Sequence, residues 1–385
     1  MFTIANGLLL KGKNLSPAKE NVLIDDGRIL EIGKDIMEGE IIDATDCIVM
    51  PSFLNGHTHV GDSIIKDEGY GLSLDEMVKP PNGVKHRALS ESSDNDIIEN
   101  MTSSLWDMYN SGITDFIDYR EGGVKGVKLL KKASKDIPIN PIILGRDDSF
   151  YGSNPDLKEV KIAIRKLLKH CDGIAPSGFG EIQTEVAQLI VEQCDKHGKI
   201  SSIHTAESIQ AQLNSLEKYG ETEIERAVEC GFNQIVHGTN PQNNDLNAVA
   251  NSKTNLVLCP RANAALSVGW PKLDEIIERD IKPVLGSDNV MLNSPSMFRE
   301  LEFVVKFYSL KYSKSISPLQ LVKMATTNIC YNSINSKIKK HVIDQNNSPY
   351  LLIIRQKSKN PYLSIINRSE TKHIKNIINI GNINN

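Results

Sequence analysis

Residues 48–59 read IVMPSFLNGHTH, an apolar run that ends in two histidines separated by one residue. Side chains alternate between the two faces of a β-strand, so residues i and i+2 point the same way. His57 and His59 would therefore present two imidazoles to one metal ion at the end of a strand. The pattern is weak by itself, because two histidines one residue apart also occur by chance. It predicts a metal site only if further ligands are found.

The composition is that of a globular protein in a reducing compartment. The 385 residues are 40% hydrophobic and 24% charged, with a formal net charge of −4, which gives no support for a nucleic-acid surface. Six scattered cysteines without a CxxC pair are typical of buried thiols. No apolar run approaches the ~20 residues of a membrane span, and the N-terminus does not resemble a signal peptide. We expect a cytoplasmic protein with a small-molecule substrate and no nucleic-acid or membrane partner; a homo-oligomer stays open.

The predicted pattern of secondary structure changes near residue 48, from short strands alone to alternating strands and helices. Residues 2–50 alternate short strand patterns with turn signals, which predicts a small β-structure. From residue 48 onward, strand patterns alternate with helical periodicities. The eight strand candidates are 48–54, 113–119, 139–145, 173–175, 200–204, 234–237, 255–259 and 282–285. Eight βα units over roughly 260 residues match the size and order of a (β/α)8 barrel.

The expected fold is therefore α/β: a (β/α)8 TIM-type barrel over 51–334 and a small β-sandwich-like domain formed by 1–50 and 335–385. Strand-like segments at 350–354, 362–366 and 374–380 are expected to join the N-terminal strands. The competing architecture, a doubly wound open sheet, usually carries a glycine-rich turn after its first strand. Histidines occupy that turn here, which favours the barrel.

Polar residues follow several of the predicted strands. In a barrel the chemistry lies at the C-terminal ends of the strands. His204 and Glu207 follow the fifth strand, His237 ends the sixth, and Asp288 follows the eighth. Chance would rarely place such residues at four strand ends, so the metal interpretation is favoured. The other five histidines fall in predicted loops, helices or the tail, and we interpret them as solvated side chains.

These motifs resemble those of the amidohydrolase superfamily, and within it the branch of cytosine deaminase, guanine deaminase and chlorohydrolase. The matching motifs are His57-Thr58-His59, His204-Thr205-Ala206-Glu207, His237 in Val-His-Gly-Thr, and Gly286-Ser287-Asp288-Asn289. The resemblance covers residues 1 to about 335. The combined pattern is highly specific for the superfamily, less specific for the branch and weak for the substrate.

The resemblance implies one divalent metal ion, Zn²⁺ in the first place and Fe²⁺ as the alternative. Its ligands would be His57, His59, His204 and Asp288, and three imidazoles with one carboxylate suit either metal. Two-metal relatives use a carboxylated lysine at the end of the fourth strand. The corresponding segment here, residues 172–177, reads DGIAPS and has no lysine. A mononuclear site is therefore expected.

The resemblance also implies catalytic roles for three residues. Glu207 would shuttle protons, Asp288 would help to deprotonate the attacking water, and His237 would stabilise the oxygen of the tetrahedral intermediate. The implied reaction is the hydrolytic deamination of an amino-substituted N-heterocycle, such as a pyrimidine, a purine or a related base, with release of ammonia. One alternative is the opening of a cyclic amide, as in imidazolonepropionases. Another is an inactive barrel that acts as a binding protein.

Substrate-binding residues are sought around the long segment 60–94, because long loops on this face of a barrel line or cover the site. The candidates are Asp62, Tyr70, Arg120, Arg146 and Asn289. Arginine forks bind carboxylate or phosphate well, which predicts an anionic substrate. Each arginine also has an acidic neighbour in the sequence, and an internal ion pair is an equally good interpretation.

Overall fold

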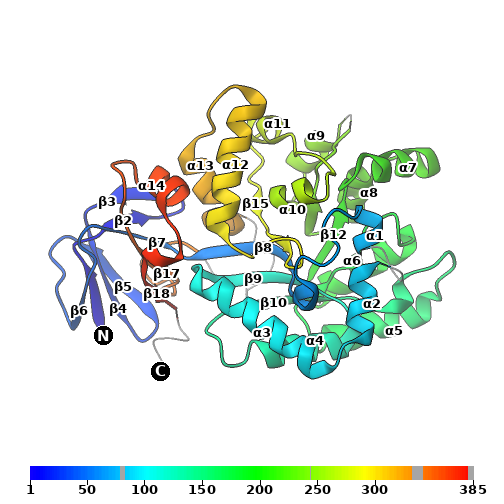
Figure 1. Ribbon diagram of the computed structural model, residues 1–385, viewed down its shortest axis with the longest axis horizontal. Helices are drawn as coiled ribbons and strands as arrows, with labels where there is room; N and C mark the ends of the chain where they lie inside the picture. The colour runs from blue at the N-terminus through cyan, green and yellow to red at the C-terminus, as the bar shows by residue number, and fades with distance from the viewer. Residues whose placement is uncertain (79–82, 243, 332–340, 380–385) are drawn as a thin grey trace.

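A nine-stranded sheet, in which every pair of neighbours is parallel, forms the centre of the structure (Figure 1). The computed structural model describes residues 1–78, 83–242, 244–331 and 341–379. In chain order the strands of this sheet are β8 (Phe53–His59), β9 (Ile113–Arg120), β10 (Asn140–Gly145), β11 (Gly173–Ile174), β12 (Ile200–Thr205), β13 (Gln234–His237), β14 (Asn255–Leu258), β15 (Val284–Leu285) and β16 (Asp288–Asn289).

The sheet closes because its eighth strand position is split in two. β15 pairs with β14, whereas β16 pairs with β8, the first strand of the sheet. Gly286 lies between the two halves, where an added Cβ would meet the backbone nitrogen of His57 at 2.9 Å. The backbone N–H of Ser287 then donates to Asn55 Oδ1 at 2.9 Å. The close approach at a glycine therefore joins the last strand to the first, and the predicted TIM-type barrel is confirmed.

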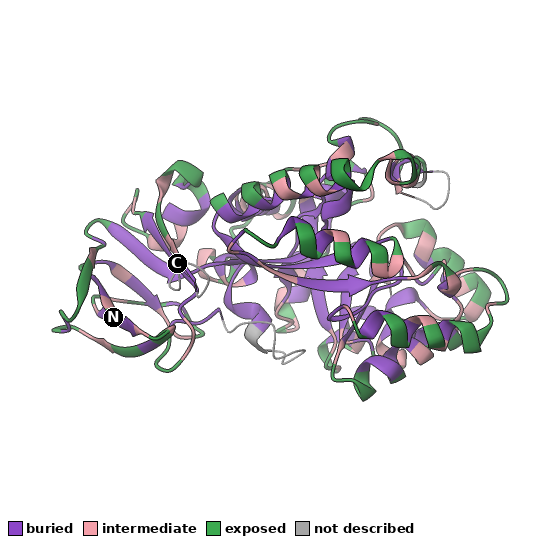
Figure 2. Cartoon of the chain, turned by 90° about the horizontal axis from the view of Figure 1, so that it is seen from below, coloured by how far each residue is buried: buried purple, intermediate pink, exposed green. Residues whose placement is uncertain are grey.

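Helices surround the sheet and turn their apolar faces toward it; Figure 2 shows the strands and the inner helix faces as buried. Those of the outer layer are α3 (Asp94–Asn110), α4 (Gly123–Ala133), α5 (Leu157–Leu168), α6 (Thr184–Lys196), α7 (Ile209–Tyr219), α8 (Glu223–Cys230), α9 (Asp245–Ala250), α10 (Pro260–Ala265), α11 (Leu273–Glu278), α12 (Met297–Tyr312) and α13 (Pro318–Met324). One apolar cluster lies between strands and helices, and a second fills the barrel interior with residues such as Leu54, Ile117 and Val236. Two apolar layers are what a packed barrel requires.

Two small sheets lie at one end of the barrel and combine strands from both ends of the chain (Figure 1). The first contains β5 (Arg28–Gly33), β4 (Asn21–Asp25), β1 (Phe2–Ala5) and β6 (Glu40–Asp43); the second contains β18 (Ile374–Ile378), β17 (Leu351–Arg355), β7 (Cys47–Pro51), β2 (Leu8–Lys11) and β3 (Ser16–Ala18). Ile4 and Val22 of one sheet share an apolar cluster with Val49 and Ile353 of the other. The boundary predicted near residue 335 lies outside the described residues and stays a prediction.

Two predictions of local structure are wrong. Residues 362–366 belong to a helix, α14 (Pro361–Arg368), because Asn360 caps it by accepting from the Leu363 backbone N–H at 3.0 Å and Pro361 suits the first helical turn. The predicted strand 48–54 is two strands of two different sheets, β7 and β8, which separate at Ser52. Within the described residues, no helix is long and apolar enough to span a membrane.

Candidate metal centre and active-site cavity

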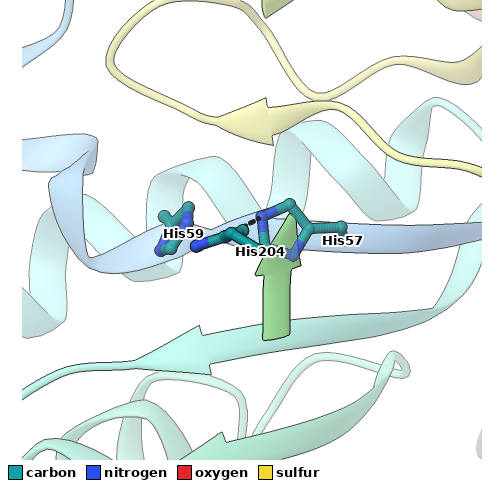
Figure 3. A group of neighbouring side chains, drawn as sticks. All are labelled: His57, His59 and His204. Atoms are coloured by element: carbon teal, nitrogen blue, oxygen red, sulfur yellow. Dashed lines mark hydrogen bonds between the residues drawn. The ribbon is translucent and has the colours of Figure 1, made fainter. Parts of the chain in front are cut away.

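Four predicted ligands meet at the C-terminal ends of β8, β12 and β16. Figure 3 shows His57 and His59 on β8 facing His204 on β12. The Nε2 atoms of His57 and His204 are 3.2 Å apart. Asp288 Oδ1 lies 3.2 Å from His57 Nε2 and 3.6 Å from His59 Nε2. Because side chains alternate along β8, both of its histidines point to the same side. There they lie beside the carboxylate of Asp288, which comes from β16, the strand that pairs with β8 and closes the barrel.

The protonation states of these residues suit a metal ion. Burial lowers the pKa of His59 to about 3 and that of His204 well below its usual value. Burial favours the protonated form of Asp288, but the hydrogen bond and charge of His57 outweigh it and hold the pKa of Asp288 below its usual range. Neutral imidazoles and an ionised carboxylate are the forms that bind metal. The ligand atoms form two overlapping groups that could each hold an ion: His57 with His59 and His204, and His57 with His237 and Asp288. His57 belongs to both groups, and three imidazoles with one carboxylate fit one divalent ion.

Backbone strain marks two strand ends of the site. His237 has φ 75° and Asp288 has φ 61°, both in the left-handed region that side chains with a Cβ rarely adopt. The Gly238 backbone N–H donates to the Thr205 carbonyl at 3.0 Å, which fixes the chain just after His237. Such strain persists where the surrounding structure determines it, and it is concentrated at functional sites.

His237 and Glu207 face each other beside the candidate ligands. His237 Nε2 lies 3.6 Å from Glu207 Oε2 and 4.0 Å from Asp288 Oδ2. On the other side of the ring, Asn263 Oδ1 lies 3.1 Å from Nδ1, and because a carbonyl oxygen only accepts, the proton of the neutral ring is on Nδ1. Burial lowers the pKa of His237 to about 4. Its Nε2 is therefore free to accept a proton from the site.

The surroundings of Glu207 favour its protonated form. Its side chain is only 20% exposed, and burial, followed by the negative charges of Asp288, Glu223 and Glu181, raises its pKa well above the usual value. A carboxyl group beside a nucleophilic centre that keeps its proton at neutral pH can act as a general acid.

A cavity of about 700 Å³ opens over this cluster. His59, His204 and Asp288 form part of its wall, together with Glu207 and His237. The cavity is large enough for a heterocyclic substrate of drug size. Candidate ligands, a proton donor and a proton acceptor thus share one space at the face of the barrel where catalysis is expected.

The family model described as "Amidohydrolase family" matches residues 48–367, which is most of the chain and contains every residue of the metal centre and the cavity named in this subsection. The chain belongs to the amidohydrolase family. The resemblance seen in the sequence motifs is therefore confirmed, and the protein is a hydrolytic enzyme.

Named relatives of this amidohydrolase include deaminases. A protein named "Putative aminohydrolase" from Methanothermobacter thermautotrophicus is 43% identical over 375 residues, which cover 97% of this chain and 96% of the relative. A 5-methylthioadenosine/S-adenosylhomocysteine deaminase from Thermococcus sibiricus is 24% identical over 84% of this chain and 79% of its own length.

Solved structures show the same fold at low sequence identity. An adenosine deaminase from Xanthomonas campestris with bound zinc has a TM-score of 0.85 at 14% identity, over 99% of this chain and 92% of the other. An atrazine chlorohydrolase from Arthrobacter aurescens TC1, complexed with zinc and atraton, has a TM-score of 0.84 at 14% identity, over 98% and 94%. A guanine deaminase from C. acetobutylicum with bound guanine has a TM-score of 0.81 at 16% identity, over 98% of both chains.

The five predicted substrate-binding residues of this amidohydrolase lie in different surroundings. Arg146 and Asn289 line the cavity. Asp62 is buried and accepts from Asn289 Nδ2 at 2.7 Å and from the Met291 backbone N–H at 3.0 Å, so it joins the segment after β8 to the segment after β16. Arg120 is buried in ion pairs, and Tyr70 is 96% exposed; neither lines the cavity. Substrate-binding roles for these residues stay predictions.

The long segment after β8 is largely helical. It contains the 3₁₀ helix η1 (Val60–Ile65), α1 (Leu74–Val78) and α2 (Val84–Glu91). Ile65 and Met77 of this segment pack in one apolar cluster with Leu266 and Met291. Residues 79–82 of this segment lie outside the described residues. The apolar cluster packs the rest of the segment over the end of the barrel.

Four residues of the site were not identified from the sequence. Glu121 directly follows β9, so the rule that polar strand ends carry function could have found it. Tyr119 packs its ring against His57, with 4.4 Å between ring centroids, and bonds Ser202 through its hydroxyl group. Asn263 and Lys85 come from α10 and α2, where no periodicity distinguishes them from surface residues.

Proposed function

We propose that this amidohydrolase deaminates an amino-substituted N-heterocycle, with one divalent metal ion, in the first place zinc, and water as the co-substrate. The observation that carries the proposal is the pairing of a proton-holding Glu207 with His237, 3.6 Å apart, at the edge of the four predicted ligands. The names of the relatives and the bound zinc in fold neighbours support it.

A divalent ion held by His57, His59, His204 and Asp288 would lower the pKa of a water molecule toward neutrality and thereby supply the hydrolytic nucleophile. Asp288 and His237 accept the proton of the attacking water, since Oδ2 and Nε2 lie 4.0 Å apart and face the same space. Once protonated, His237 carries an N–H on both sides of its ring. It then stabilises the negative oxygen that develops on the substrate.

Glu207 provides the proton that makes the substrate reactive. It donates to the ring nitrogen next to the amino-bearing carbon, which makes this carbon electrophilic. The C–O bond forms first and gives a tetrahedral carbon. Of the two protons that the water loses, one passes to the amine and the other returns to Glu207. The C–N bond then breaks and ammonia leaves. A raised pKa suits this first donation, because it increases the fraction of Glu207 that carries the proton.

The test is ammonia release by the zinc-loaded enzyme over a panel of aminopyrimidines, aminopurines and lactams. We expect ammonia from at least one amino-substituted heterocycle, and loss of activity when the metal is removed by a chelator and restored by one equivalent of Zn²⁺ or Fe²⁺. Opening of a lactam ring without ammonia would instead favour a cyclic-amide hydrolase. Absence of metal from the purified protein, with no turnover of any compound after metal is added, would favour a binding protein.

A further inference from the structure

We infer that the substrate carries an anionic group, a carboxylate or a phosphate, that binds between Lys85 and Arg146 on the wall of the cavity formed by β8–β10. The inference rests on the proposed function, because it assumes that the cavity over the metal centre is the substrate site. It goes beyond that function by assigning the charge of the substrate and the two side chains that recognise it.

One carboxylate oxygen joins both cations to a predicted metal ligand. Glu121 Oε1 lies 2.6 Å from Lys85 Nζ and 2.8 Å from Arg146 Nη2. The same oxygen lies 3.4 Å from His59 Nδ1. The ammonium and the guanidinium are therefore held next to the reaction centre rather than at the mouth of the cavity. An anion that they bind would be attached to the heterocycle directly or through a short linker.

The two cations face the cavity while their shared carboxylate lies behind them. Lys85 is 2% exposed and Arg146 is 7% exposed, yet both contribute to the cavity wall, and Glu121 does not. Glu121 instead binds a third cation, Arg120, on its far side. Two further buried carboxylates lie near the cations but beyond hydrogen-bond distance, Asp62 Oδ2 at 3.8 Å from Lys85 Nζ and Asp118 Oδ2 at 3.9 Å from Arg120 Nη1. Lys85 and Arg146 therefore share one hydrogen-bonded carboxylate, Glu121, while they face the cavity, and a buried charge is costly unless an opposite charge meets it.

Each cation keeps donors for a ligand. A lysine ammonium has three N–H donors, and Glu121 accepts one of them. Asp62 Oδ2 lies 3.8 Å from Lys85 Nζ, too far for a hydrogen bond, and accepts from Asn289 instead. Arg146 uses Nη2 on Glu121 and Nη1 on Ser177 Oγ at 2.8 Å, and a guanidinium has five N–H donors in all.

The acidic groups of the cavity lie mainly on the wall opposite Lys85 and Arg146. This separation of charge predicts which end of the substrate faces each wall. Glu207 follows β12 and Glu223 begins α8, whereas Lys85 and Arg146 come from segments after β8 and β10. Glu181, half-buried after β11, lies between them along the barrel. A heterocycle whose basic ring nitrogen meets Glu207 would therefore turn an anionic substituent toward Lys85 and Arg146. A neutral or cationic substituent would give the cavity-side donors of the two cations no anionic acceptor beyond Glu121.

The direct test is calorimetric binding of inorganic phosphate and of benzoate to the zinc-loaded enzyme, with benzamide as the uncharged match of benzoate. The variants are Lys85→Met and Arg146→Gln, and Lys218→Met is the control because Lys218 lines the outer, exposed part of the same cavity. Any binding of these anions to the metal itself is common to all variants. We expect Kd to rise at least tenfold in the first two variants and to stay within twofold in the control. Lys85→Arg should retain binding, which separates lost charge from lost folding.

The outcomes separate this inference from the proposed function. Phosphate binding alone would assign a phosphate group, and benzoate binding alone a carboxylate. Equal affinity of all variants for both anions, or no anion binding by the wild type, would overturn the inference even if ammonia is released from neutral heterocycles. Conversely, variant-sensitive anion binding together with a failed ammonia panel would overturn only the deaminase proposal. Zinc content measured on every variant checks that the metal centre is intact.

Discussion

Two glutamates beside the cavity have pKa values that are shifted in opposite directions. Glu121 lies behind the wall formed by β8–β10; burial favours its protonated form, but the charges of Lys85, Arg146 and Arg120 outweigh burial and hold its pKa well below the usual range. Glu207 lines the wall of β12 and β13, and no lysine or arginine of the described residues forms an ion pair with it; burial and the nearby carboxylates raise its pKa. The surroundings therefore favour the charged form of one glutamate and the protonated form of the other.

The comparison suggests a division of roles within one site: Glu121 would position a neighbouring side chain by its charge, and Glu207 would transfer protons. Glu121 touches His59, and its negative charge can orient the imidazole and increase its basicity. Glu207 touches His237 and can exchange protons with the site. If this division is correct, removing charge from the two glutamates should have different consequences: lost turnover for one, and lost metal affinity and stability for the other.

The largest effect is expected for Glu207→Gln, which keeps the shape of the side chain but cannot shuttle a proton. We expect kcat to fall by about 10²- to 10⁴-fold with zinc content unchanged, measured by ammonia release and metal analysis. Glu217→Gln, on the exposed face of α7 and outside the cavity lining, is the matched control and should retain activity within a few-fold. Loss of zinc from Glu207→Gln would show that Glu207 is a ligand and not a proton shuttle.

Glu121→Gln should act on stability and metal affinity instead. It leaves Lys85, Arg120 and Arg146 buried without their shared anion, which should lower the free energy of unfolding by roughly 3–5 kcal/mol. Loss of the contact to His59 should weaken zinc binding by about 10- to 100-fold. Urea unfolding and zinc titration measure the two effects, and Glu99→Gln on the exposed face of α3 is the control. An unchanged zinc affinity would contradict the positioning role.

Acid should release the metal and destabilise the protein through the histidines. The pKa values of His59 and His237 are lowered to about 3 and about 4, below the usual value of 6.5. The unfolded chain therefore binds more protons than the folded chain below pH 6.5, and stability is lost as pH falls from 6.5 toward 3. Each histidine loses at most about 1.4 kcal/mol of stabilisation for every pH unit of this fall. Unfolding and zinc release should be followed together between pH 7 and pH 4; stability that is constant over this range would contradict buried neutral imidazoles.

The smallest effect is expected for Asn263→Ala, which removes the acceptor of the His237 Nδ1 proton. Loss of one hydrogen bond costs about 0.5–1.5 kcal/mol, so kcat/KM should fall by roughly tenfold or less. Because the ring can then change tautomer, the acidic limb of the pH–rate profile should also move, which a purely structural role would not cause. Asn263→Asp, with a stronger acceptor, should move that limb to higher pH. A pH profile identical to that of the wild type in both variants would contradict this positioning role.

The barrel and the cluster of its strand-end residues could be predicted because both depend on local periodicity. Alternation along β8 places His57 and His59 on one face, and parallel strands bring His204, His237 and Asp288 to the same end. The fold and the family are confirmed. The structure places the four predicted ligands in two overlapping groups that share His57, the second of which also contains His237; their role as ligands stays a prediction. The strand predicted at 362–366 failed because a cap at Asn360 outweighed an apolar pattern too short to define a period.

The sequence by itself predicted the barrel from its periodicity, and it predicted the family and the chemistry at the strand ends through the resemblance of its motifs. Only the tertiary structure decided which charges meet. Lys85 lies on α2, Glu121 directly follows β9, and Arg146 follows β10. The ion pair between α2 and the end of β9 depends on how α2 packs over the barrel, and no periodicity encodes that packing. The long-range contacts that lower the pKa of Glu121 and raise that of Glu207 could be seen only in the folded chain.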